Sequence, residues 1–195
     1  MTDVIIAMLG LVATAPLLVV LGVTIRLMSP GPALFHQARL GRDGRPFDIW
    51  KLRTMDAADP DATALVTGIH DPRITRIGGW LRRTRLDELP QLINLLKGDL
   101  TLIGPRPEVS RFIRQYTVDE LMLLQVRPGI IGPGAVLFAC EQAAELDAVD
   151  EPDAFYIAHH LHPRLTLDLD YLAHRSLRRD LALVLRAIMI CIGHG

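Results

Sequence analysis

The segment from Leu86 to Pro107 reads LDELPQLINLLKGDLTLIGPRP, and its pattern predicts a helix, a short strand and a rigid turn. Asp87 stands where a helix N-cap is expected, and Pro90 falls in the first turn, which tolerates a residue without an N–H. Gly98 marks the expected end of the helix. Leu100–Ile103 favours a short buried strand. The apolar residues of the predicted helix share one face: Leu89, Leu92, Ile93 and Leu96.

Two adjacent carboxylates, Asp87 and Glu88, open this helix. Neighbouring helical side chains diverge by about 100°. At a helix N-terminus both still reach one site, because the partial positive charge there stabilises anions. A carboxylate in that position is a competent nucleophile or magnesium ligand. The alternative is structural, since an N-cap aspartate followed by an acidic residue is common at helix starts.

Arg106 lies between Pro105 and Pro107, which fix the backbone on both sides. A rigidly presented guanidinium binds phosphate through two hydrogen bonds at a low ordering cost. A surface turn is the alternative interpretation. The other candidates for binding a substrate phosphate are also basic residues: Lys51, Arg53, Arg82 and Arg127.

Composition limits the class of protein. The chain has 195 residues, a net charge of −1 and a hydrophobic fraction of 50%, which suits one domain with a substantial core. Basic clusters beside apolar segments favour an anionic membrane face and anionic substrates. Aromatic residues are not interleaved with these clusters, so nucleic acid is not an expected partner. Cys140 and Cys191 have no metal or redox spacing.

The N-terminal region contains a long apolar run. Val4–Ile25 has no charged residue, and as a helix it would be about 33 Å long, enough to cross a bilayer. A secretory signal peptide is a poorer fit, because a positive n-region is absent and Pro16 follows the only plausible cleavage site. Arg26 and the arginines after it place the remainder on the cytoplasmic side.

Pro16 divides this run into two arms and removes the backbone donor that would pair with Val12. The result is either a kinked spanning helix or a re-entrant helix that returns to the side it left. Physical reasoning from the residues alone favours spanning, because irregular backbone in lipid is costly.

The rest of the chain predicts a small, mostly helical α+β domain with short strands. Strands are expected at Ala33–Gln37, Pro46–Leu52 and Ala135–Ala139, and a polar loop at Asp56–Asp71. The expected helices are Arg76–Arg83, Glu108–Tyr116, Val118–Leu124, Phe155–His160, Leu165–His174 and Arg178–Ile192, the last of which either lies in the membrane interface or packs on the domain.

Nearly the whole chain resembles the bacterial sugar transferase family of monotopic phosphoglycosyl transferases. The resemblance rests on the order of many short motifs. They are Ser29–Pro32, Gln37–Gly41, Trp50–Met55, Leu86–Leu92, Gly98–Asp99, Gly104–Pro107, Arg127–Ile130 and Leu169–Tyr171.

The resemblance implies transfer of a phosphosugar from a nucleotide diphosphate sugar, usually a UDP-sugar, to a polyprenyl phosphate such as undecaprenyl phosphate, with release of UMP. This is the first membrane step of exopolysaccharide or O-antigen synthesis. It implies Asp87 as the nucleophile, Mg²⁺ at Asp87 and Glu88, and phosphate binding by Arg106 and Arg82, with Lys51 and Arg53 as further basic residues.

The resemblance also implies a location. It implies that residues 1–28 form a re-entrant anchor that bends at Pro16, whereas the residues alone favour a spanning helix. Residues 29–195 become the catalytic domain, with interfacial helices, on the cytoplasmic face of the bacterial inner membrane.

Departures from the family pattern bear on sugar choice. Ile131 replaces a common threonine, and Gly132–Ala135 replaces the more widespread Gly-Trp-Ala-Gln type. Only Met1 and Thr2 precede Asp3, so the basic pair that is usual before this aspartate in the family is missing. No transmembrane bundle is expected ahead of the anchor, and in this the chain resembles the small form of the family. Two rival functions remain: a non-catalytic membrane adaptor, and a hydrolase of lipid-linked diphosphates that uses water as acceptor.

Overall fold

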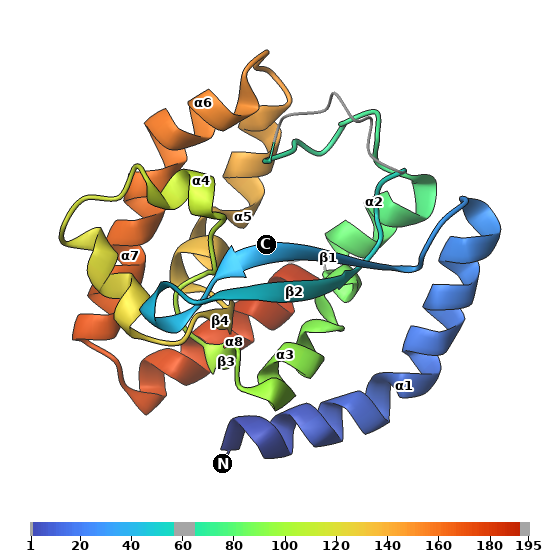
Figure 1. Cartoon of the computed structure of the whole chain (residues 1–195), viewed down its shortest axis with the longest axis horizontal. Helices are drawn as coiled ribbons and strands as arrows, with labels where there is room; N and C mark the ends of the chain where they lie inside the picture. The colour runs from blue at the N-terminus through green and yellow to red at the C-terminus, as the bar shows by residue number, and fades with distance from the viewer. Residues whose placement is uncertain (1, 57–64, 192–195) are drawn as a thin grey trace.

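The structure is a computed structural model that describes residues 2–56 and 65–191. A β-hairpin lies at its centre, with α1–α3 on one side and α4–α7 on the other (Figure 1). Strands β1 (Leu34–Leu40) and β2 (Pro46–Leu52) pair antiparallel, with Leu34 opposite Leu52. The turn η1 (Arg42–Gly44) joins them, and Asp43 adopts a left-handed φ of 58° there. The predicted hairpin is confirmed, although β1 runs three residues beyond Gln37.

The segment around the two carboxylates differs from the sequence prediction. Helix α2 (Arg76–Arg83) has the predicted bounds and is capped by Thr75. The 3₁₀ turn η2 (Leu86–Glu88) follows, and α3 (Gln91–Lys97) begins only after Pro90. The prediction that Asp87 caps a continuous helix is therefore wrong. Pro90 has no N–H to continue a ladder, so the chain forms a separate turn before α3.

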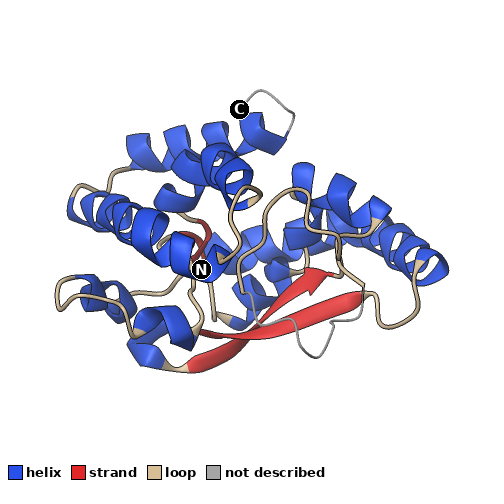
Figure 2. Cartoon of the chain, turned by 90° about the horizontal axis from the view of Figure 1, so that it is seen from above, coloured by secondary structure: helices blue, strands red, loops and turns tan. Residues whose placement is uncertain are grey.

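The C-terminal half is helical. Its elements are β3 (Thr101–Ile103), α4 (Ser110–Ile113), η3 (Glu120–Gln125), β4 (Gly129–Ile131), α5 (Pro133–Leu146), α6 (Pro152–Tyr156), the π-helical turn η4 (Ile157–Leu161), α7 (His162–Ala173) and α8 (Leu177–Cys191). Figure 2 shows the long hairpin in the lower part of the molecule with most helices above it. Strands β3 and β4 pair in parallel.

The predicted strand at Ala135–Ala139 is wrong, because these residues lie inside α5. Pro133 occupies the first helical turn, where its fixed φ favours a helix. The predicted helix at Glu108–Tyr116 is much shorter, as the four-residue α4. The predicted helix at Val118–Leu124 is a six-residue 3₁₀ helix, η3, that begins two residues later. Half of the predicted loop at Asp56–Asp71, residues 57–64, lies outside the described residues, and the described remainder forms no helix or strand.

Helix α1 (Thr2–Met28) is long and apolar enough to cross a membrane. It is bent, so that its two arms form a corner around α3 (Figure 1). In the first arm Gly10 lies against α3, where an added Cβ would come 3.1 Å from Leu92. In the second arm Leu21 and Ile25 pack with Leu52 of β2 and Leu81 of α2. Both arms therefore rest on the same domain.

The described chain is thus mainly helical with a few short strands and one long apolar N-terminal helix, as the α+β prediction required. A second core, centred on Phe112, Tyr156, Leu161 and Leu165, joins α4, α6 and α7. The core around Leu52 holds β2 against α1 and α2, and Lys51 of the same strand contacts Glu88 of η2, so the carboxylates of η2 lie beside the hairpin.

Candidate active site

Glu88 lies at the centre of a cluster of cations. Its Oε1 accepts a hydrogen bond from Lys51 Nζ at 2.8 Å and lies 3.4 Å from Arg106 Nη2 and 3.9 Å from Arg85 Nη1. Burial alone would raise the pKa of Glu88, but these cations together hold it below its ordinary value. Glu88 is therefore ionised, and three cationic side chains surround one of its carboxylate oxygens.

Asp87 is the neighbouring carboxylate, and its surroundings differ. Its side chain is buried, and Oδ1 has no hydrogen-bond partner among the described residues. Burial raises the pKa of Asp87 above its ordinary value, and Lys51 opposes only part of that rise. Buried polar atoms are rarely left unpaired unless they serve a function or bind an absent group. This oxygen is therefore a candidate nucleophile or ligand.

Lys51 and Arg106 are the two sequence-predicted residues that the structure brings to Glu88. Lys51 comes from β2, and burial lowers its pKa although Glu88 opposes this. Arg106 extends from the proline-bracketed turn between β3 and α4. Sequence reasoning missed Arg85 as a site residue, although it stands two positions before Asp87. It adopts a left-handed φ of 57°, an unusual conformation for arginine that turns the chain into η2.

Arg82 lies near the carboxylates but is bound to threonines. Its Nε donates to Thr54 Oγ1 and its Nη1 to Thr67 Oγ1, both at 2.9 Å. Burial lowers the pKa of Arg82, and the charge of Asp87 raises it, so the two side chains interact electrostatically. Arg82 is thus held beside Asp87 without a direct hydrogen bond to it among the described contacts.

Arg53 and Arg127 are placed elsewhere. The Arg53 guanidinium donates to the carbonyl oxygens of Pro30 and Ser29 and to Ser29 Oγ, the last two at 2.8 and 2.9 Å. It joins the end of β2 to the segment after α1. Arg127 is exposed before β4. Phosphate binding by these two arginines stays a prediction.

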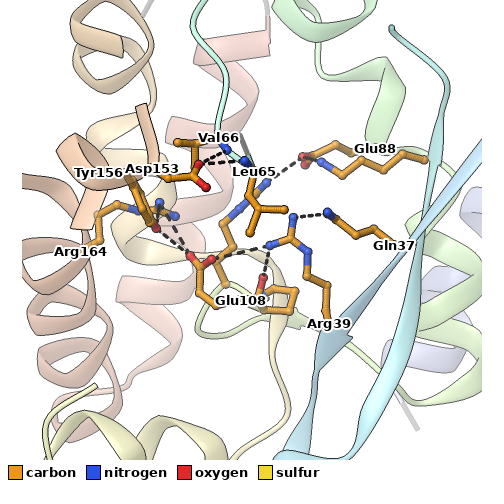
Figure 3. A network of polar contacts seen from close by, with 12 residues as sticks. Gln37, Arg39, Leu65, Val66, Glu88, Glu108, Asp153, Tyr156 and Arg164 are labelled. Atoms are coloured by element: carbon orange, nitrogen blue, oxygen red, sulfur yellow. Dashed lines mark hydrogen bonds and ion pairs between the residues drawn. The ribbon is translucent and has the colours of Figure 1, made fainter. Parts of the chain in front are cut away.

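A network of polar contacts centred on Glu108 (Figure 3) is joined to the turn that carries Arg106 through the Pro107 carbonyl. Glu108 Oε1 accepts a hydrogen bond from Tyr156 at 2.8 Å, and Tyr156 accepts one from Arg164 at 2.6 Å. On the other side Glu108 Oε2 lies 3.6 Å from Arg39, which also donates to the Pro107 carbonyl at 3.3 Å. This network ties β1, α6 and α7 to the turn that presents Arg106.

Asp168 of α7 is a second support. Its Oδ1 accepts the backbone N–H of Gly134 at 2.8 Å. Burial raises the pKa of Asp168 to about 6. The hydrogen bonds from the backbone N–H groups of Gly134 and Arg106 lower this pKa but offset only part of the rise. Gly132 packs on the same turn, since an added Cβ would come 3.2 Å from Arg106 N. Sequence reasoning also missed Asp168, because it lies far from Arg106 along the chain.

Asp168 predicts a pH-dependent contribution to stability. Its pKa of about 6 in the folded protein exceeds the value of about 3.9 for an unfolded chain. Between these values the folded state binds more protons, so this contribution is fully present below about pH 4 and is lost as the pH rises to about 6. The loss is about 3 kcal/mol.

Asp168→Asn keeps an oxygen for the Gly134 N–H but does not titrate, so it should lack this loss. The unfolding midpoints of the two proteins in detergent micelles, compared from about pH 4 to about pH 7, should show the wild type falling relative to the variant. Parallel profiles for wild type and Asp168→Asn would contradict the pKa assignment.

The predicted magnesium ion fits the residues at the site. Mg²⁺ in enzymes that handle phosphate is commonly held by one or two carboxylates together with substrate phosphates and water. The Asp87 Oδ1 atom, unpartnered among the described residues, suits that role. Glu88 Oε1 already faces three cations, so Asp87 is the better placed ligand. Magnesium binding, at Asp87 as well as at Glu88, stays a prediction.

A carboxylate pair among partly buried lysine and arginine side chains, in a chain with one helix long and apolar enough to cross a membrane, is the arrangement expected of a membrane-associated enzyme that acts on phosphate groups. The bacterial sugar transferase family matches residues 1–194. The chain belongs to this family.

Relatives with related names are similar over nearly the whole chain. The UDP-glucose:undecaprenyl-phosphate glucose-1-phosphate transferase of Caulobacter vibrioides is 39% identical over 193 residues, covering 95% of this chain and 66% of the relative. The Escherichia coli K12 protein of the same name is 35% identical over 185 residues, covering 93% and 37%. The undecaprenyl-phosphate glucose phosphotransferase of Komagataeibacter xylinus is 36% identical over 194 residues, covering 95% and 34%. The chain thus spans between about one third and two thirds of the length of these relatives.

Proposed function

We propose that this protein transfers a phosphosugar from a nucleotide diphosphate sugar, of the UDP-sugar class, to a polyprenyl phosphate of the undecaprenyl type. The observation that carries the proposal is the buried Asp87 Oδ1, which has no partner in the described part of the chain and lies beside the cation cluster around Glu88. The names of the similar proteins supply the substrate classes.

In the first step an oxygen of the Asp87 carboxylate bonds to the phosphorus that carries the sugar. The bond from that phosphorus to the bridging oxygen of the diphosphate breaks, and UMP leaves with that oxygen and its electron pair. Arg106 and Lys51 would stabilise the charge on the phosphoryl oxygens. Asp87 would hold Mg²⁺, which would supply further charge neutralisation at the phosphoryl group.

In the second step a phosphate oxygen of the polyprenyl phosphate attacks the same phosphorus. The bond from phosphorus to Asp87 breaks, which restores the carboxylate and yields a polyprenyl diphosphate sugar. Two steps through one carboxylate predict ping-pong kinetics.

A non-catalytic adaptor would have no use for a buried carboxylate oxygen without a partner, which lowers stability. The product of the reaction distinguishes transfer to polyprenyl phosphate from hydrolysis, in which water is the acceptor. Purified protein in vesicles with polyprenyl phosphate, Mg²⁺ and a panel of nucleotide sugars should yield a polyprenyl diphosphate sugar, detected by mass spectrometry, and UMP. Free sugar phosphate together with UMP, and no lipid-linked product, would mean that water is the acceptor.

The anchor is proposed to be re-entrant, with both its ends on the cytoplasmic side of the bacterial inner membrane. Two contacts support this. Thr101 of β3 donates a hydrogen bond to Asp3 Oδ2 at 2.8 Å, which ties the start of α1 to the domain. The end of α1 is tied to the same domain by Arg53 and Ser29. A helix that crosses the bilayer would separate Asp3 from Thr101 by the thickness of the membrane.

The topology predicts a labelling pattern. A cysteine at Thr2, in a protein whose two native cysteines are replaced by serine, should stay unlabelled by a membrane-impermeant thiol reagent in intact cells. Pro16→Leu restores the missing backbone donor and favours a straight helix, so the same cysteine should gain label. Val12→Leu, a change of similar size on the exposed face of α1, is the control. Strong labelling with Pro16 in place would establish a spanning helix.

A further inference from the structure

An apolar groove of about 380 Å³ lies between the second arm of α1 and the central hairpin. Gly22 and Val23 of α1 form one wall, and Leu52 of β2 with Ile93 of α3 form the other. Its volume falls in the range of about 300 to 1,000 Å³ that is typical of ligand pockets. Val23 is 53% exposed, so the groove opens on the face of α1 that would meet lipid.

The groove adjoins the candidate active site. Leu52 is the next residue after Lys51, whose ammonium binds Glu88 at 2.8 Å. Successive residues of a strand point to opposite faces, so one strand separates the groove from the cation cluster. Pro90 also lines the groove and stands two positions after Glu88. The groove and the carboxylates therefore meet at the same end of α3.

The charge of the residues that line the groove indicates which kind of ligand it binds. Arg26 is the only charged residue among the described residues that line the groove. It lies in the last turn of α1, at the end of the arm that faces the domain. An apolar groove with one cation at its rim suits an amphiphile that has a long apolar chain and an anionic phosphate. A neutral hydrocarbon would gain nothing from Arg26.

We propose that this groove binds the first isoprene units of the polyprenyl phosphate acceptor and thereby directs its phosphate to Asp87. The proposal rests on the proposed function for the identity of the acceptor. From Leu18 to Arg26 the groove follows α1 over about 12 Å at the helical rise, so it takes a part of a long chain. The remainder of that chain stays in the bilayer.

A matched pair of α1 variants tests the groove. Val23→Trp places a large ring where Val23 lines the groove, whereas Val20→Trp places the same ring at a position that is 60% exposed and outside the groove. In vesicles, Val23→Trp should raise KM for polyprenyl phosphate at least tenfold. Val20→Trp should leave it within twofold of wild type. Single-turnover release of UMP, which needs no acceptor, should be unchanged in both variants.

A second measurement does not depend on activity. A polyprenyl phosphate with a photoreactive group in its first isoprene units, in phosphatidylcholine vesicles, should label peptides that contain residues 18–26 and 90–93. Unlabelled polyprenyl phosphate should compete, and phosphatidylglycerol should not.

Equal competition by phosphatidylglycerol would mean that ordinary lipid fills the groove, and a normal KM in Val23→Trp would overturn the proposal. Absence of UMP release by the wild type would contradict the proposed function instead, and the labelling result would still decide the occupancy of the groove.

Discussion

Asp87→Asn is expected to abolish transfer, with a loss of at least about 10³-fold, or about 4 kcal/mol of transition-state stabilisation. Asparagine fits the buried space of aspartate but is not a nucleophile towards phosphorus at neutral pH. Wild-type protein incubated with nucleotide sugar and no acceptor should gain the mass of one phosphosugar. The variant should gain none while it still fractionates with membranes.

Two further variants make this test specific. Asp43→Asn changes a carboxylate that is 57% exposed in η1 and should leave the adduct intact. Glu88→Gln should be severely impaired, because it leaves Lys51, Arg85 and Arg106 without their shared anion. Full turnover by Asp87→Asn would eliminate Asp87 as the nucleophile, whatever the behaviour of Glu88.

Arg106→Lys is expected to lower kcat/KM at least tenfold, about 1.4 kcal/mol. Lysine keeps the charge but loses the planar pair of donors that grips two phosphate oxygens. The turn between Pro105 and Pro107, held by Asp168 and the Glu108 network, presents the guanidinium in one direction. The ammonium of a lysine, on a flexible side chain, would not be held in that direction by the rigid turn. The measurement is steady-state kinetics with nucleotide sugar varied at saturating acceptor.

Arg111→Lys is the matched control, since Arg111 is 59% exposed and pairs with Asp153 outside the site. It should retain normal kinetics. Catalysis close to wild type in Arg106→Lys would mean that Arg106 acts only as a counter-charge to Glu88, a role that lysine also fills.

Local sequence signals predicted the elements whose formation depends on neighbours in the chain. The bounds of β2 and α2 were predicted correctly, because both are short elements that depend on residues close together in the chain; α2, for example, is capped by the adjacent Thr75. Gly98 ends α3 as expected, with a left-handed φ of 82°. The segment at Ala135–Ala139 was predicted wrongly, since a short apolar run does not distinguish a strand from a helix.

The motifs by themselves determined the family and the two carboxylates. Tertiary structure alone decided how those carboxylates differ. Asp87 is not a helix cap but a buried group in η2, and Glu88 is the anion that collects Lys51 from β2, 37 positions away. Arg53, equally basic in the sequence, instead fastens the anchor to the hairpin.

The physical reason lies in distance along the chain. Caps, turns and periodicity act within a few residues, so the sequence by itself determined most short elements and the order of motifs. The pKa of Asp168, the direction of Arg106 and the corner that α1 forms around α3 depend on burial and on partners from remote segments. Only the packed tertiary structure brings those partners together.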